Sequence, residues 1–145
     1  MDYQNLSVPE LQKIHSMVQE ELKNRRVHSP LDMESLLKKY AKKTVEYFLV
    51  VTFNGNHIPI KVHEITKGLV NRTMMHPREV FRAAIKDNAV SIIVAHNHPS
   101  GSLEFSCEDK GMFKRLKDAG EILGINVLDS MIISKTGYAS DLENN

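Results

Sequence analysis

The chain has 145 residues, of which 41% are hydrophobic and 26% charged, and its formal net charge at pH 7 is +1. This length and apolar content suit a single small domain with one core. The balanced charge argues against nucleic acid or an anionic membrane as a partner.

The cellular compartment is predicted from cysteine use and apolar runs. The single cysteine excludes an intramolecular disulfide and is typical of a reducing compartment. No apolar run reaches the roughly 18 residues that a membrane span needs, and the chain shows no signal peptide. We therefore expect a soluble cytoplasmic protein with no membrane partner.

Residues 1–29 predict an N-terminal helical extension. Ser7 and Glu10 have the spacing of a capping box, which marks the start of a helix. The residues that follow form an apolar stripe at helical spacing: Leu11, Ile14, Val18 and Leu22. We interpret this helix as packed on the core, with docking to a partner or homodimerisation as the alternative. Residues 30–145 then form the main domain.

The main domain is predicted to begin with a helix and a β-hairpin. Residues 31–43 predict the helix and residues 45–53 the first core strand, while Asn54-Gly55 is a strong hairpin turn signal. Pro59 confines the return strand to a sheet edge or a bulge. The positions expected to face the core are Leu36, Leu37 and Tyr40 in the helix and Ile58, Ile60 and Val62 in the return strand.

Helices and strands alternate in the second half of the chain. Pro77 begins a helix, residues 90–95 predict a strand buried on both faces, and Ser106 caps a helix that ends at Gly124. Residues 125–134 predict another strand. The inward helix positions are Val80, Phe81, Ala84, Ile85, Met112, Phe113, Leu116, Ala119 and Leu123. Together with the early hairpin, this order predicts a mixed α/β sheet flanked by helices.

A metal site is predicted where the buried strand ends. His96 and His98 are two residues apart, so in an extended chain both imidazoles point to the same side of the sheet. Asp109 lies in the first turn of the helix that Ser106 caps. Two imidazoles and one carboxylate suit a catalytic Zn²⁺ with water as its fourth ligand, although iron and manganese accept the same ligand types. The alternative is that the histidines pack locally and Asp109 only completes a capping box.

The spacing of these residues resembles a known motif. His96-Asn97-His98, seven residues, Ser106, two residues and Asp109 resemble the JAMM motif of MPN+/JAB metalloproteases, His-x-His-x7-Ser-x2-Asp. The string from His96 to Gly101, with His76-Pro77-Arg78-Glu79-Val80-Phe81 before it, is similar to the RadC-like branch. The resemblance covers residues 30–145 and implies the MPN/JAB, cytidine-deaminase-like architecture.

The resemblance also implies a function. It is that of a zinc-dependent hydrolase that cleaves peptide or isopeptide bonds of a protein or peptide substrate with a metal-activated water. In this family the motif serine, here Ser106, helps to stabilise the oxyanion. A non-catalytic metal-binding or interaction module is an alternative. A role in DNA repair, as the RadC label suggests, is another, but the sequence shows no helix-hairpin-helix and gives it little support.

Hydrolysis of this kind also needs a general base. The resemblance implies a glutamate at the entry to the first core strand, and the matching residue is Glu46, immediately before Tyr47. A carboxylate at that place is costly unless it faces a polar site, which favours the assignment. Glu64 is the alternative, because it continues the inward phase of the return strand. Ser130 departs from the family pattern, because relatives usually have a histidine there and a serine cannot supply the same imidazole contact.

Overall fold

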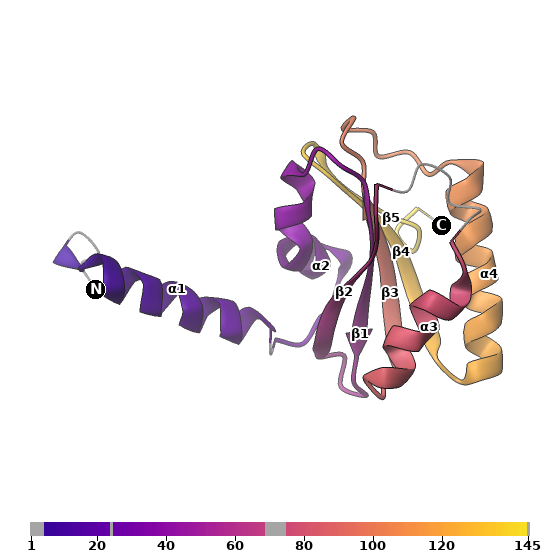
Figure 1. Ribbon diagram of the computed structural model, residues 1–145, viewed down its shortest axis with the longest axis horizontal. Coiled ribbons are helices and arrows are strands. Elements are labelled where there is room, and N and C mark those ends of the chain that lie inside the picture. The colour runs from indigo at the N-terminus through magenta and orange to yellow at the C-terminus, as the bar shows by residue number, and fades with distance from the viewer. Residues whose placement is uncertain (1–4, 24, 69–74, 145) are drawn as a thin grey trace.

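The structure is a computed structural model that describes residues 5–23, 25–68 and 75–144. Within these ranges a five-stranded mixed sheet carries helices on both faces (Figure 1), which confirms the predicted fold class. The elements in chain order are α1 (Val8–Lys23), α2 (Pro30–Leu37), the 3-10 helix η2 (Lys38–Lys42), β1 (Tyr47–Phe53), β2 (Pro59–Lys67), α3 (Pro77–Lys86), β3 (Ser91–Asn97), α4 (Cys107–Leu123), β4 (Asn126–Ser134) and β5 (Gly137–Ser140). None of the described helices is long and apolar enough to cross a membrane.

The strands lie in the order β2-β1-β3-β4-β5. β3 and β4 are parallel. A parallel pair needs a crossover connection, and α4 provides it. The other neighbouring strands are antiparallel, and the hairpin predicted at Asn54-Gly55 joins β1 to β2. β2 is an edge strand of the described sheet, as Pro59 predicts.

Both faces of β1 and β3 are buried, as their apolar runs predict. α3 and α4 cover one face, and α2 with η2 covers the other (Figure 1). The strand residues buried on the α3–α4 face are Phe48, Val50, Ile92 and Val94. Those on the α2 face are Tyr47, Leu49, Val51, Phe53, Ile93 and Ala95, together with Met131 and Ile133 of β4. This division matters for the site, because neighbouring residues in a strand belong to different faces.

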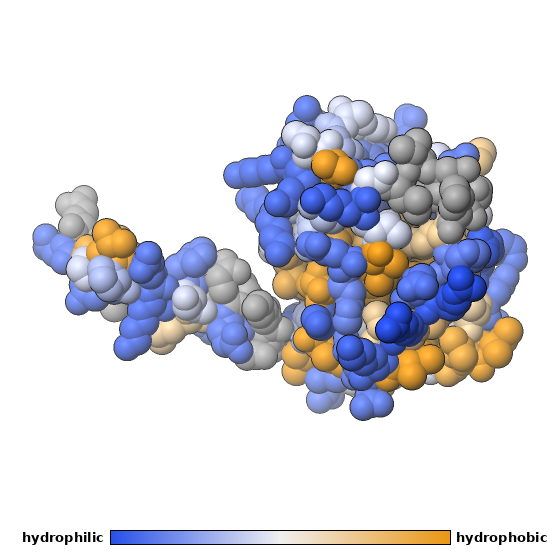
Figure 2. Space-filling view, viewed as in Figure 1, coloured by the Kyte–Doolittle hydropathy of each residue, from blue (hydrophilic) through white to orange (hydrophobic). Residues whose placement is uncertain are grey.

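The prediction that α1 packs on the core is wrong. Its capping box forms, with Ser7 N donating to Glu10 Oε2 at 2.7 Å and Glu10 N donating to Ser7 Oγ at 3.3 Å. The helix nevertheless projects from the domain as an arm, and Leu11 and Val18 are exposed on it (Figures 1 and 2). Within the described residues, α2 with η2 and α3 with α4 already cover the two faces of the sheet, so neither face is left for α1. Leu22 lies outside the described side chains, and docking or dimerisation through α1 stays a prediction.

Three residues expected to face the core are exposed instead: Ile60, Ile85 and Leu123. A register shift between Thr52 and Phe53 changes the phase of the edge strand β2, which explains Ile60. Ile85 and Leu123 lie in the last turns of α3 and α4, where the chain is about to leave the helix for the next strand. The buried stripes of these two helices end earlier, at Ala84 and Gly120.

Candidate metal centre

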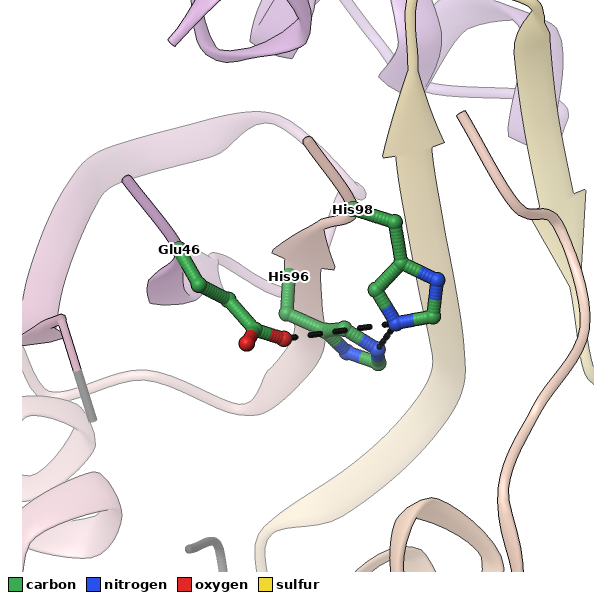
Figure 3. Close-up of side chains that lie close together, drawn as sticks. All are labelled: Glu46, His96 and His98. Atoms are coloured by element: carbon green, nitrogen blue, oxygen red, sulfur yellow. Dashed lines mark hydrogen bonds and ion pairs between the residues drawn. The ribbon is translucent and has the colours of Figure 1, made fainter. Parts of the chain in front are cut away.

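Two imidazoles lie side by side at the end of β3. His96 is buried, and its ring stacks on that of Phe48 in β1 with 6.4 Å between centroids. His98 follows the strand, and its backbone N–H donates to the Ile133 carbonyl of β4 at 3.0 Å. The two side chains point to the same side, as their spacing predicts, and their Nε2 atoms are 2.9 Å apart (Figure 3).

The loop after β3 sets the orientation of His98. Its Nδ1 lies 3.0 Å from the Ser102 carbonyl oxygen. A carbonyl oxygen only accepts, so Nδ1 is the donor in this contact; in the neutral imidazole Nε2 then has the lone pair that metal ligation requires. Gly101 bends the loop with a φ of +90°, a conformation that suits glycine, and its carbonyl accepts from Thr136 Oγ1 at 2.8 Å.

Asp109 both caps α4 and faces the imidazoles. Its Oδ2 accepts from Ser106 N at 2.9 Å, and Ser106 Oγ accepts from Asp109 N at 3.0 Å, which completes a capping box. Oδ1 lies 3.5 Å from His96 Nε2, and Oδ2 lies 4.0 Å from His98 Nε2. The side chain is only 1% exposed. Capping and a place beside the histidines are therefore compatible roles.

Glu46 approaches the histidines from the start of β1. It precedes Phe48 by two residues and therefore shares the face on which His96 lies. Its Oε1 is 4.0 Å from His98 Nε2, and one ligand atom from each of Glu46, His96 and His98 lies within 4.8 Å of the others (Figure 3). The Glu46 side chain as a whole is 27% exposed, but Oε1, the oxygen nearer to His98, is buried.

Glu64, the other carboxylate considered for the base, lies on the opposite face of the sheet. It pairs with Leu49 in the β1–β2 ladder, and its Oε1 accepts from the Tyr40 hydroxyl at 2.9 Å. Burial, together with this carboxylate, raises the pKa of Tyr40. The structure thus brings Glu46, and not Glu64, beside the two histidines.

The spacing of the donor atoms fits a metal ion. Atoms about 2.0–2.1 Å from a tetrahedral Zn²⁺ lie roughly 3.4 Å from one another. The 2.9 Å between the two imidazole nitrogens and the 3.5 and 4.0 Å between nitrogens and carboxylate oxygens lie around that value. Imidazole and carboxylate are ligands that zinc accepts. The described residues therefore include a candidate metal-binding group of Glu46, His96 and His98, and Asp109 adjoins it.

Ser130, which departs from the family pattern, lies next to this group. It is buried in β4 and lines a void of about 10 Å³ together with His96 and Asp109. The void is about the size of one water molecule.

Asn97 is a residue of this region to which the sequence assigns no role. It lies between the two histidines, and its side chain points to the main chain on either side of Glu46. Oδ1 accepts from Tyr47 N at 2.6 Å, and Nδ2 donates to the Val45 carbonyl at 2.9 Å. An asparagine that ends an apolar strand is the available signal, because a buried carboxamide must find hydrogen-bond partners.

Comparison with known proteins gives a match over most of the chain. The sequence model of the RadC-like JAB domain matches residues 27–145. A UPF0758 protein of Staphylococcus haemolyticus is 45% identical over 119 residues, which cover 81% of this chain and 52% of the relative. A UPF0758 protein of Clostridium novyi is 43% identical over 122 residues, or 82% of this chain and 53% of the relative. The chain spans about half the length of these curated relatives.

Proposed function

The chain belongs to the RadC-like JAB domain family, and from this premise we propose that it is a zinc-dependent hydrolase of peptide or isopeptide bonds. The observation that carries the proposal is the meeting of two imidazoles and two carboxylates from three separate elements at one partly open site. His96, His98 and Asp109 are the proposed ligands, and Glu46 is the proposed general base. A protein or peptide is the proposed substrate.

The different surroundings of the two carboxylates support these roles. Asp109 is 1% exposed and the capping box holds its Oδ2, so the orientation of the carboxylate is fixed, as a ligand requires. The Glu46 side chain is 27% exposed with its Oε1 turned to the buried side next to His98, so it lies between solvent and the histidines. A group that moves protons needs such a position, whereas a ligand does not.

The reaction would divide among the residues as follows. Zinc, when bound, supplies a Lewis acid and a water molecule with a pKa of about 7. Glu46 accepts a proton from the water that attacks the substrate carbonyl and passes it to the leaving nitrogen. Ser106 Oγ accepts from Asp109 N, and its own O–H proton is available to the oxyanion of the tetrahedral intermediate.

Metal content and cleavage, measured on the same preparations, test the proposal. We expect wild-type protein to bind about one zinc ion per chain and to cleave members of a panel of peptide and isopeptide substrates. The double variant His96→Ala/His98→Ala should lose both properties, and a chelator should abolish cleavage by the wild type. His57→Ala is the matched control, because His57 is exposed in the β1–β2 loop.

The outcomes separate the candidate functions. Stoichiometric zinc in the double variant would refute the site. Zinc binding by the wild type without cleavage of any panel member would contradict hydrolysis and favour a non-catalytic metal-binding module. Tight DNA binding that weakens steeply with added salt would favour the DNA-repair role instead.

A further inference from the structure

The side chain of Asn97 holds the backbone on both sides of Glu46. Its Oδ1 accepts from Tyr47 N at 2.6 Å, and its Nδ2 donates to the Val45 carbonyl at 2.9 Å. Asn97 is 1% exposed, so water does not compete for either hydrogen bond. One buried carboxamide thus binds the backbone of both residues next to Glu46, Val45 and Tyr47.

These hydrogen bonds continue the sheet beyond its last backbone pair. The β1–β3 ladder ends where Phe48 pairs with His96. One step further, the backbone pairing is replaced by the carboxamide of Asn97. In the same register Glu46 falls opposite His98, which agrees with the 4.0 Å between Glu46 Oε1 and His98 Nε2. Asn97 therefore extends the register of the β1–β3 pair to Glu46.

A third hydrogen bond holds Glu46 from the other side. Gly68 N donates to the Glu46 carbonyl at 2.7 Å. Gly68 has a φ of +75°, which residues other than glycine rarely adopt. Consecutive peptide groups around Glu46 are therefore tied to β3 by Asn97 and to the end of β2 by Gly68.

Asparagine suits this position better than its near neighbours in chemistry. The site needs an acceptor for Tyr47 N–H and a donor for the Val45 carbonyl on one short side chain. Aspartate lacks the donor, leucine lacks both groups, and glutamine is one methylene longer in a buried space. The requirement is thus for a carboxamide at this distance from the backbone.

We propose that Asn97 is a positioning residue that holds Glu46 beside the imidazoles by fixing the main chain on either side of it. The inference rests on the proposed function for the task that Glu46 performs. Asn97 itself forms its side-chain hydrogen bonds with the backbone and acts only through the glutamate. The same residue that separates the two histidines in the sequence thereby sets the distance between them and the carboxylate.

A double-mutant cycle on zinc affinity tests this. The negative charge of Glu46 favours a cation at His98, so Glu46→Gln should weaken zinc binding, measured by chelator competition. Asn97→Ala should weaken it comparably, by roughly 10-fold, the low end for groups that orient a metal site. In the Glu46→Gln background Asn97→Ala should change zinc affinity little further, because the carboxylate that Asn97 positions is already absent. Asn126→Ala, at an exposed asparagine, is the control.

Two results would overturn the inference. One is an equal loss of affinity from Asn97→Ala in both backgrounds, which indicates a general structural role. The other is unchanged zinc affinity in Asn97→Ala when Glu46→Gln weakens it. If Asn97→Ala does not fold, Asn97→Ser serves in the same cycle.

Amide exchange keeps this inference separate from the proposed function. We expect the Tyr47 amide to exchange faster in Asn97→Ala while the Val50 amide, in the middle of β1, is unchanged. If the wild type binds no zinc, the proposed function fails. If Glu46→Gln binds zinc as tightly as the wild type, zinc affinity does not report on the position of Glu46. In both cases the exchange rate of the Tyr47 amide decides. Faster exchange confined to Tyr47 supports the anchoring role, and unchanged exchange at Tyr47 refutes it.

Discussion

Tyr40 donates a hydrogen bond to Glu64 at 2.9 Å on the face of the sheet opposite to His96. This contact and the position of Glu46 at 4.0 Å from His98 place the two candidate carboxylates on different faces. Only one of them can therefore reach a substrate at the histidines.

The first prediction compares these two glutamates. Glu46→Gln should lower the rate of hydrolysis by about 10²–10⁴-fold, because the proton acceptor is removed. Glu64→Gln should leave the rate unchanged, since a glutamine oxygen can still accept from Tyr40. Steady-state kinetics on zinc-loaded protein would measure both. Comparable losses in the two variants, or full activity in Glu46→Gln, would refute the assignment of the base.

The second prediction separates the two roles of Asp109. In Asp109→Asn the amide oxygen can still accept from Ser106 N, while the carboxylate charge beside His96 is lost. We expect weaker zinc binding with little change in stability. Ser106→Ala should do the opposite, costing about 0.5–2 kcal/mol of stability through the lost cap while the proposed ligands stay in place. Chelator competition and urea unfolding of the metal-free proteins would measure the two effects.

The contrary outcome for this pair is also clear. If Asp109→Asn binds zinc as tightly as the wild type, Asp109 is a helix cap and the third ligand is another residue, with Glu46 the nearest carboxylate.

The third prediction concerns packing between α4 and β4. A Cβ atom added at Gly120 would overlap the Ile125 carbonyl oxygen and lie 3.0 Å from Val127 Cγ2. Because the closer contact is with backbone, Gly120→Ala should lower the free energy of unfolding by about 1–3 kcal/mol. Gly111 in the same helix has open space at the corresponding position. Gly111→Ala should therefore raise stability by roughly 0.5–1 kcal/mol.

Urea denaturation of both glycine variants would check this. If the two substitutions change stability in the same direction, the close approach of α4 to β4 is not what requires Gly120.

The fourth prediction concerns pH and Asp129. Burial raises the pKa of this carboxyl, although hydrogen bonds from Ser140, Leu142 N and Ser130 N oppose the shift. The folded state therefore holds the proton more tightly than the unfolded chain, whose pKa is about 3.9. Stability from this group is present below that value and is lost as pH rises through the folded-state pKa. Asp129→Asn should remove this loss. The free energy of unfolding of the variant should therefore increase relative to that of the wild type as pH rises above about 4.

Unfolding by urea at a series of pH values would measure the difference in stability between Asp129→Asn and the wild type. A difference that stays constant or decreases with rising pH contradicts the prediction.

The opposite dependence of stability on pH is expected from Asp87. Burial alone would raise the pKa of this carboxyl, but hydrogen bonds from His63 at 2.6 Å and Thr52 at 2.7 Å, with the charges of His63 and Lys61, lower it below its usual value. Its stabilisation is therefore present above about pH 3.9 and is lost as pH falls through the folded-state pKa. Asp87→Asn should make acid unfolding less steep. If the stability of Asp87→Asn falls with decreasing pH as steeply as that of the wild type, these hydrogen bonds do not favour the charged form of Asp87.

Several features could be predicted because they depend on residues close together in the chain. The capping boxes at Ser7 and Ser106 need side chains three residues apart, and both form. The shared side of His96 and His98 follows from the two-residue repeat of a strand. The αL residue that ends α4 needs a glycine, and Gly124 has a φ of +72°.

Other features could not be predicted, because they depend on which elements meet. The sequence alone left Glu46 and Glu64 as alternatives, since Glu46 matches the family position at the strand entry and Glu64 continues the inward phase of the return strand. Their separation follows from the pairing of Leu49 with Glu64 and of Phe48 with His96, which puts them on different faces. The exposure of α1 likewise depends on α2, α3 and α4 having already covered the sheet.

By itself, the sequence determined the order of the helices α1 to α4 and the strands β1 to β4, the mixed sheet and the short-range placement of two histidines and a capped aspartate. These follow from backbone geometry and hydrogen bonds over a few residues. The tertiary structure alone decided which glutamate joins the histidines and that Asn97 holds it there. Asn97 is some fifty residues away from its hydrogen-bond partners, and only the register between β1 and β3 brings them together.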